Sequence, residues 1–475
     1  MAMNSEFKIT KSTHENLLRK AIAKDPNNCE AWKLLFLLLI KDFNFQEIIF
    51  LTKKAFTLCP AHTDLQKICF HASLHALNID WANYLIGSKE LKDSINSDEI
   101  LSHQLYYLSL VNSLKNKHSI FQPSDLHEDF EKFNSWVFNS AAPLAIDVIF
   151  LLSQPFHFSI QSGIANCLKD LGLNCIFTNQ LWVALYLSPH SLITSESLYS
   201  NYGFAKAFIP NCLFVNTRHG IADKNYAAVG ASASDRVCVS SDSISKLFIN
   251  NLHIDESKIW VTGFPQMDTF FQSLDKASAR VSKNKTVLFA PTYNQDLSCL
   301  HLIKDKSLTK LIRGENQEIE IIIKPHPLIG RDDPSLLRQW ELESKTHPNV
   351  KLINEPSSNL YNIFSDSDLM VTDMSSAGLA WMATGKPIIN LIDPDSLPKS
   401  ERFAKDGLEW QYLSSSVVIN KATDLNGAVL KSLERPFENA ENRKKYSDFL
   451  FGNLRDGKAS ERIARLVLNY IKTKR

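Results

Sequence analysis

The stretch IIKPHP at residues 322–327, together with VTDMSSAG at residues 371–378, indicates the fold and the position of a ligand site. Each stretch begins with apolar, β-branched residues, which is typical of the end of a buried parallel strand. Ligands of open α/β sheets bind at that end of the strands. The lysine and histidine of the first stretch can neutralise phosphate oxygens, and the serines of the second can hold them beside a helix N-terminus. The two stretches predict a site for a nucleotide diphosphate.

Similar strand-like runs, alternating with helical stretches, recur from about residue 145 onward. This alternation predicts an α/β fold with two consecutive Rossmann-like domains, each built on a doubly wound parallel sheet. A stretch at 274–285, rich in Ser, Lys and Asp, separates the two sets of runs. We therefore expect one domain at residues 145–283 and a second at residues 284–475.

The front of the chain, residues 1–144, has a helical pattern without a convincing strand. Segments 21–26 and 55–60 match at alanine and proline positions that lie 34 residues apart, which is the tetratricopeptide period. Two such repeats do not bury a continuous core by themselves. We expect a tetratricopeptide-like region that leans on further helices or on the α/β body. It is either a surface for a protein partner or a helical cap that only packs.

The composition limits the class of protein. The 475-residue chain is 44% hydrophobic and 22% charged, as in folded proteins, and its net charge of +1 argues against a nucleic-acid binder. No apolar run reaches the roughly 20 residues of a membrane helix, and the N-terminus lacks a signal-peptide pattern. We expect a cytoplasmic protein. The eight cysteines lie in apolar contexts without a CxxC pair, so we expect reduced core residues.

Six short motifs, spread over about residues 145–475, resemble the CDP-glycerol glycerophosphotransferase family of teichoic-acid and capsule synthesis. In chain order they are RHGIADK (218–224), VTGFPQMD (261–268), FAPTY (289–293), KPHP (324–327), TDMSS (372–376) and GKPI (385–388), and RDGKASER (455–462) also fits. Each motif is weak alone, but six in the right order are specific. The resemblance implies a GT-B fold, in which two Rossmann-like domains face each other across a cleft. It also implies that the last helix, residues 459–472, crosses back to the first domain.

The resemblance implies a phosphotransferase. It would move a glycerol-phosphate unit from CDP-glycerol to a hydroxyl of a cell-surface polymer or lipid-linked acceptor. The attacking hydroxyl must lose its proton, and His219, at a strand end, is the candidate base. Lys324 and His326 would stabilise the diphosphate and the charge that develops on CMP. A strand-capping histidine and a Pro-rich structural turn are the alternative readings of these residues.

Other side chains complete the predicted site. On the donor side, Lys324 and His326 would be joined by Pro291, Thr292, Asp373, Ser375, Ser376 and Arg402. His157 and Lys224 would lie on the acceptor side, in the domain at 145–283. The serines could equally be helix N-caps, Asp373 could hold nearby backbone, and Asp268 is expected to be structural. We expect no metal or cofactor, because Lys, His and a helix terminus can supply the positive charge.

Three positions depart from the family pattern. Ile221 replaces a threonine, Met374 replaces a tyrosine, and Ala380 lies near the place of an acidic residue. Because of these departures, the sequence defines the phosphate chemistry of the site better than the identity of the donor. Two alternatives stay open: a GT-B glycosyltransferase or epimerase using a UDP- or CMP-sugar, and a catalytically inactive helical-repeat adaptor. Without a membrane span or a basic excess, we expect at most peripheral, salt-sensitive membrane association.

Overall fold

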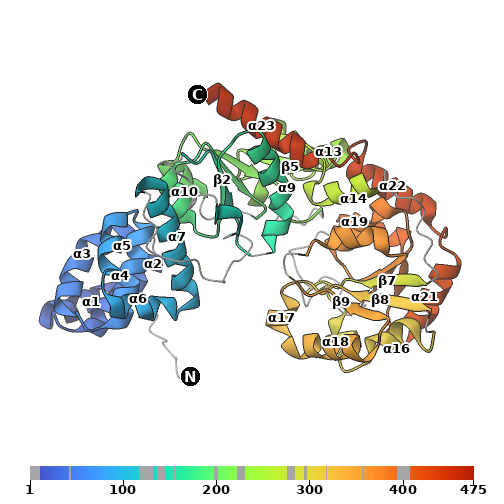
Figure 1. The fold of residues 1–475 in the computed structure, drawn as a ribbon, viewed down its shortest axis with the longest axis horizontal. Coiled ribbons are helices and arrows are strands. Elements are labelled where there is room, and N and C mark those ends of the chain that lie inside the picture. Colours follow the sequence, from blue (N-terminus) through green and yellow to red (C-terminus); the bar gives the residue numbers. More distant parts are fainter. Residues whose placement is uncertain are drawn as a thin grey trace, which may run out of the picture. The chain divides into compact units, whose positions relative to one another are not determined.

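The computed structural model describes residues 11–41, 44–116, 132–135, 145–154, 156–196, 202–221, 230–274, 284–293, 297–316, 318–355, 358–392 and 407–474. The chain forms two compact units (Figure 1). A helical unit comprises Met1–Ala145 with Gln180–Ser188, and an α/β unit comprises Ile146–Asn179 with Pro189–Arg475. Within the ranges described, no helix is both long enough and apolar enough to cross a membrane.

The helical unit contains two helix pairs that repeat along the chain. Its helices are α1 (Lys11–Lys24), α2 (Cys29–Lys41), α3 (Phe45–Leu58), α4 (Thr63–His75), α5 (Ile79–Leu85), α6 (Lys89–Asn96), α7 (Glu99–Asn116) and α10 (Leu181–Leu187). Helix α3 begins and ends 34 residues after α1, and α4 begins and ends 34 residues after α2. The helical character of the described part of this region is as predicted. Its assignment to the tetratricopeptide class stays a prediction.

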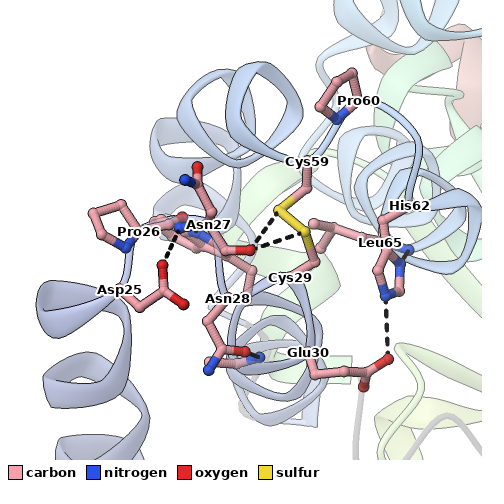
Figure 2. Close-up of a disulfide and its surroundings, with 12 residues drawn as sticks. Asp25, Pro26, Asn27, Asn28, Cys29, Glu30, Cys59, Pro60, His62 and Leu65 are labelled. Atoms are coloured by element: carbon pink, nitrogen blue, oxygen red, sulfur yellow. Dashed lines mark hydrogen bonds and ion pairs between the residues drawn. A yellow bond between two sulfur atoms is a disulfide. The ribbon is translucent and has the colours of Figure 1, made fainter.

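A disulfide joins the two helix pairs (Figure 2). Cys29 begins α2 and Cys59 directly follows α3, and the Asn27 carbonyl oxygen lies 3.3 Å and 3.9 Å from their sulfur atoms. Beside it, His62 Nε2 lies 3.1 Å from Glu30 Oε1. The expectation that all eight cysteines are reduced is therefore wrong for this pair. The 34-residue repeat brings the loop before α2 close to the loop after α3. The residues around each cysteine do not show that the two cysteines lie together.

The first sheet of the α/β unit has six parallel strands in the order β2-β1-β3-β4-β5-β6. They are β1 (Val148–Leu151), β2 (Cys175–Thr178), β3 (Ser191–Thr194), β4 (Leu213–Asn216), β5 (Arg236–Val239) and β6 (Ile259–Val261). The helices of this half are α9 (His157–Asp170), α11 (Tyr202–Phe208), α13 (Asp242–Asn250) and α14 (Asp268–Leu274), with the 3-10 turns η3 (Glu256–Lys258) and η4 (Pro265–Met267). Strands β1 to β4 are buried along their whole length, as expected of a sheet with both faces covered. The strand order reverses between β1 and β3, where doubly wound sheets bind ligands.

The second sheet is also parallel, in the order β12-β11-β10-β7-β8-β9. Its strands are β7 (Lys285–Phe289), β8 (Ile319–Ile323), β9 (Val350–Leu352), β10 (Leu369–Thr372), β11 (Ile388–Leu391) and β12 (Val417–Ile419). Its helices are α15 (Leu300–Ile303), α16 (Leu308–Arg313), α17 (Ile329–Asp332), α18 (Pro334–Thr346), α19 (Ser376–Trp381), α20 (Leu408–Gln411) and α21 (Leu425–Glu434), with the 3-10 turns η5 (Leu360–Asp366), η6 (Met382–Thr384), η8 (Tyr412–Ser415) and η9 (Ala422–Asp424). Here the order reverses between β7 and β10. The predicted fold class, two separate Rossmann-like sheets after a helical region, is confirmed.

The last two helices, α22 (Ala440–Phe451) and α23 (Ala459–Lys474), contact the first-sheet half. Helix α23 packs against α9 (Figure 1). The Asp268 carboxylate accepts hydrogen bonds from the backbone N–H groups of Ala459 and Ser460, at 2.9 Å and 2.7 Å. The predicted return of the last helix to the first domain is confirmed, and so is the structural place of Asp268.

An apolar core joins the two sheet-bearing halves of the α/β unit. Phe264 and Phe270, beside the first sheet, pack edge-on against Tyr361 and Phe364 of η5, with ring centroids 5.7 Å and 5.9 Å apart. All four rings are buried. This packing holds the segment after β6 of the first sheet against η5, which precedes β10 of the second sheet. The boundary expected between residues 283 and 284 stays a prediction.

Candidate active site

Three polar side chains meet at the carboxyl ends of adjacent strands of the first sheet. His157 follows β1 and begins α9, Glu196 follows β3, and His219 follows β4. Glu196 Oε1 lies 2.9 Å from Nδ1 of His219 and 3.2 Å from Nε2 of His157. The two imidazole rings are 5.9 Å apart. The strand order therefore assembles a carboxylate between two histidines.

The two histidines of this group differ in exposure. The His157 side chain is 1% exposed, whereas that of His219 is 46% exposed. The Glu196 carboxylate therefore lies between a buried imidazole and an exposed one. His157 Nδ1 lies 3.4 Å from the Ser153 hydroxyl. Of the two histidines, His219 is thus the one that a substrate can reach.

Burial and charge act in opposite directions on these groups. Burial lowers the pKa of His157, and the neighbouring Glu196 carboxylate partly restores it. Burial alone would raise the pKa of Glu196, but its contacts with the two histidines outweigh this and hold that pKa below its usual value. Glu196 is therefore ionised, and acts only as a hydrogen-bond acceptor.

The backbone around Glu196 and His219 is held by other residues. The Asn216 side chain donates to the Glu196 carbonyl at 2.9 Å, and the Thr194 hydroxyl accepts from the Glu196 N–H at 3.2 Å. The Gln266 side chain donates to the His219 carbonyl at 3.0 Å. Arg218 has a φ of 59°, in the left-handed region that a non-glycine residue seldom adopts, and such strain concentrates at functional sites.

A series of ring contacts leads from this group to the second sheet. The Phe156 ring lies 4.3 Å from the His157 ring and 5.8 Å from the ring of His326, which follows β8. His326 is in turn 4.5 Å from the ring of Tyr293, which follows β7. His326 Nδ1 accepts from the Leu328 N–H at 3.2 Å, which leaves its proton on Nε2. The predicted base and the predicted diphosphate ligand thus lie in one neighbourhood.

The His219 loop also approaches the serine pair of the second sheet. A Cβ on Gly220 would lie 3.0 Å from the Ser376 hydroxyl, so a side chain at residue 220 would crowd it. Ser375 caps α19, and its hydroxyl accepts from the Ala377 N–H at 3.2 Å. The capping role that the sequence left open for Ser375 is therefore present.

Lys324 and Asp373 are more buried than expected of direct ligands. Lys324 is 5% exposed, and its Nζ donates to the Glu355 carbonyl at 3.2 Å, while burial lowers its pKa. Asp373 is fully buried, and its carboxylate accepts from the backbone N–H groups of Thr292 and Cys299. Burial raises the pKa of Asp373 to about 7, although these hydrogen bonds favour the ionised form. Asp373 thereby ties the loop after β7, with Pro291 and Thr292, to β10.

Two predicted site residues, Lys224 and Arg402, lie outside the described residues. Conversely, Glu196, Phe156 and Tyr293 were not predicted. Glu196 could have been found from the sequence because it lies in a polar loop directly after a strand-like run. His219 was selected for the same reason. Over the parts of the chain that are described, no group of three or more His, Cys, Asp or Glu residues is arranged to hold a metal ion.

The protein is similar in sequence to enzymes of teichoic-acid synthesis. It is 25% identical over 240 residues to the teichoic acid poly(ribitol-phosphate) polymerase of Bacillus spizizenii, covering 48% of this chain and 36% of the relative. It is 22% identical over 243 residues to the teichoic acid glycerol-phosphate primase of Bacillus subtilis, covering 50% of this chain and 59% of that protein. The chain thus matches less than two thirds of either relative.

The fold is that of a solved enzyme. The structure of the wall teichoic acid polymerase TagF aligns with a TM-score of 0.52 at 12% identity, covering 82% of this chain and 99% of that one. A TagF variant soaked with CDPG aligns with a TM-score of 0.50 at 14% identity, covering 79% and 98%. The family model described as CDP-Glycerol:Poly(glycerophosphate) glycerophosphotransferase matches residues 193–469, more than half of the chain. The protein therefore belongs to the CDP-glycerol:poly(glycerophosphate) glycerophosphotransferase family.

Proposed function

We propose that this protein transfers a polyol-phosphate unit, namely glycerol phosphate, from a CDP-activated donor to a hydroxyl of a cell-surface polymer or lipid-linked acceptor. Membership of the family supports the reaction class. The observation that carries the proposal is the series of ring contacts from the exposed His219, through His157 and Phe156, to His326. A base and a diphosphate ligand from two different sheets then act on one substrate.

The proposed step is an in-line displacement at the distal phosphorus of the donor. The acceptor oxygen forms a bond to this phosphorus as the bond to the bridging oxygen breaks, and CMP leaves with that oxygen. His219 takes the proton of the acceptor hydroxyl through Nε2. Glycerol phosphate is then joined to the acceptor by a phosphodiester. The atoms balance without a further reactant.

The second sheet supplies the donor side in this proposal. His326 would donate from Nε2 to a diphosphate oxygen, because its Nδ1 already accepts a backbone hydrogen bond. Ser376 and Thr292, beside Pro291, would contact the phosphates, with Asp373 and Ser375 acting through the backbone that they hold. The buried Lys324 cation would add positive potential at the end of β8. His157 and Lys224 belong to the acceptor side and Arg402 to the donor side.

The remaining parts of the chain have separate roles in the proposal. Residues 145–283 would act as the acceptor-side domain and residues 284–475 as the donor domain. Residues 1–144 would present a tetratricopeptide-like surface to a protein partner. Association with the inner face of a membrane would be peripheral and salt-sensitive. Recovery of the protein in the membrane fraction after a high-salt wash would contradict this last point.

Donor preference tests the proposal directly. The purified protein is incubated with CDP-glycerol, CDP-ribitol or a UDP-sugar, with and without a glycerol-phosphate oligomer as acceptor, and release of CMP and UMP is followed. We expect CMP release from a CDP-polyol that depends on the acceptor. UMP release alone would instead support a sugar transferase or epimerase. Full biological effect without any nucleotide release would support the inactive adaptor.

A further inference from the structure

The Glu196 carboxylate contacts the candidate base of the proposed reaction. Its Oε1 lies 2.9 Å from Nδ1 of the candidate base His219. The backbone of Glu196 is held independently, through the Asn216 side chain and the Thr194 hydroxyl. Its carboxylate is therefore not needed to hold the loop after β3, and its contacts among the described residues are with the two histidines.

We propose that Glu196 is the positioning residue of His219: it accepts the Nδ1–H hydrogen bond and so fixes the tautomer whose Nε2 receives the acceptor proton. This inference rests on the proposed function and adds to it a residue outside all seven motifs of the sequence. An ionised carboxylate can only accept, so the proton of the neutral imidazole must lie on Nδ1. The same contact fixes the direction in which Nε2 points.

The charge of Glu196 also acts during the proton transfer. When His219 takes the acceptor proton it becomes an imidazolium, and a carboxylate 2.9 Å from Nδ1 stabilises that cation. Among the residues that the structure describes, the titratable groups in contact with Glu196 are His157 on α9 and His219 after β4. Burial lowers the pKa of His157, which disfavours a positive charge on that ring. The negative charge therefore acts mainly on His219.

Burial of His157 explains why the positioning acts on one histidine only. His157 Nε2 reaches the same oxygen at 3.2 Å, but the His157 side chain is 1% exposed, so an acceptor hydroxyl does not reach it. Its ring packs against Phe156 on one side and faces His219 on the other. His157 thereby packs on the buried side of Glu196. The Glu196 carboxylate is thus directed towards the exposed imidazole of His219.

The E196Q variant tests this inference, because glutamine keeps the shape and removes the charge. We expect kcat for CMP release to fall by about 10²-fold while KM for CDP-glycerol changes by less than about 2-fold. E196D, which keeps the carboxylate, should recover part of kcat. The matched control is E256Q, which alters an exposed glutamate in η3 of the same half.

A double variant separates positioning from simple structural support. If Glu196 acts through His219, E196Q/H219A should be no slower than H219A alone. A purely structural glutamate would instead make the two losses multiply. Multiplying losses, or a wild-type kcat in E196Q, would overturn the inference.

Nitrogen NMR of the histidine side chains gives a readout that does not need turnover. In the full-length protein we expect neutral His219 to carry its proton on Nδ1, and E196Q to shift the proton towards Nε2. If no CDP-polyol is turned over but this tautomer shift is seen, the proposed function fails while the positioning by Glu196 stands. A wild-type His219 with its proton on Nε2 would overturn the positioning itself.

Discussion

His219, Glu196 and His326 show how single residues acquire their places. His219 and His326 stand in motifs directly after strand-like runs, so the sequence pointed to both of them. Glu196 stands between two serines and belongs to no motif. Its position between two histidines depends on the strand order around β1 and β3, which local patterning does not reveal. For Asp373, which follows a predicted strand, the sequence left two roles open, and the structure shows the one in which its carboxylate accepts from backbone N–H groups.

The titration of one residue, Asp373, makes the free energy of unfolding depend on pH. Its pKa is about 7 in the folded protein and 3.8 in the unfolded chain, so the folded state binds this proton more tightly. The stability that this group contributes is therefore complete below pH about 4 and is lost as the pH rises through about 7. We expect wild type to lose up to about 4 kcal/mol of unfolding free energy relative to D373N over this window.

Urea unfolding of both proteins at several pH values measures this difference. D373N cannot ionise, so any cost of its altered hydrogen bonds should be nearly independent of pH. The gap between the two unfolding curves isolates the titration of Asp373. A gap that stays constant, or that grows in favour of wild type as the pH rises, would contradict the assignment.

At the scale of elements, the strand-like runs predicted two parallel sheets, and the Ala and Pro matches predicted the 34-residue spacing of the first helices. These signals are local, because each depends on neighbouring residues. The Cys29–Cys59 bond was missed because it depends on packing between successive helix pairs. The cap that the Asp268 carboxylate supplies to α23 is also a long-range contact, across about 190 residues of chain.

The Asp268 cap predicts how firmly α23 is attached. Its carboxylate accepts two N–H groups at the start of that helix, and loss of a helix cap costs about 1 kcal/mol. We expect D268A to speed hydrogen exchange of the Ala459 and Ser460 amides by about 5-fold. D170A, at an exposed position at the end of α9, is the control. Unchanged exchange in D268A would show that packing against α9 alone holds the helix.

At the scale of the α/β unit, the proposed reaction depends on two sheets that are held by one apolar core. The ordered motifs predicted that His219 and His326 would act together, although more than a hundred residues separate them. The sequence could not predict the Phe156 ring between them or the close approach of Gly220 to Ser376, because both depend on how the two halves pack. The proposed division of labour assigns proton removal to the first half and diphosphate binding to the second.

The most direct test of this division compares donor affinity and transfer rate in H219A and H326A. A base acts only as the proton moves, so H219A should lower the single-turnover rate by about 10² to 10⁴-fold and leave the Kd for CDP-glycerol nearly unchanged. H326A should weaken donor binding as well as transfer, because the diphosphate is charged before and during the reaction. H347A, at the end of α18, is the control. If H219A lost donor binding but kept its rate at saturation, His219 would be a donor ligand and the central claim would be wrong.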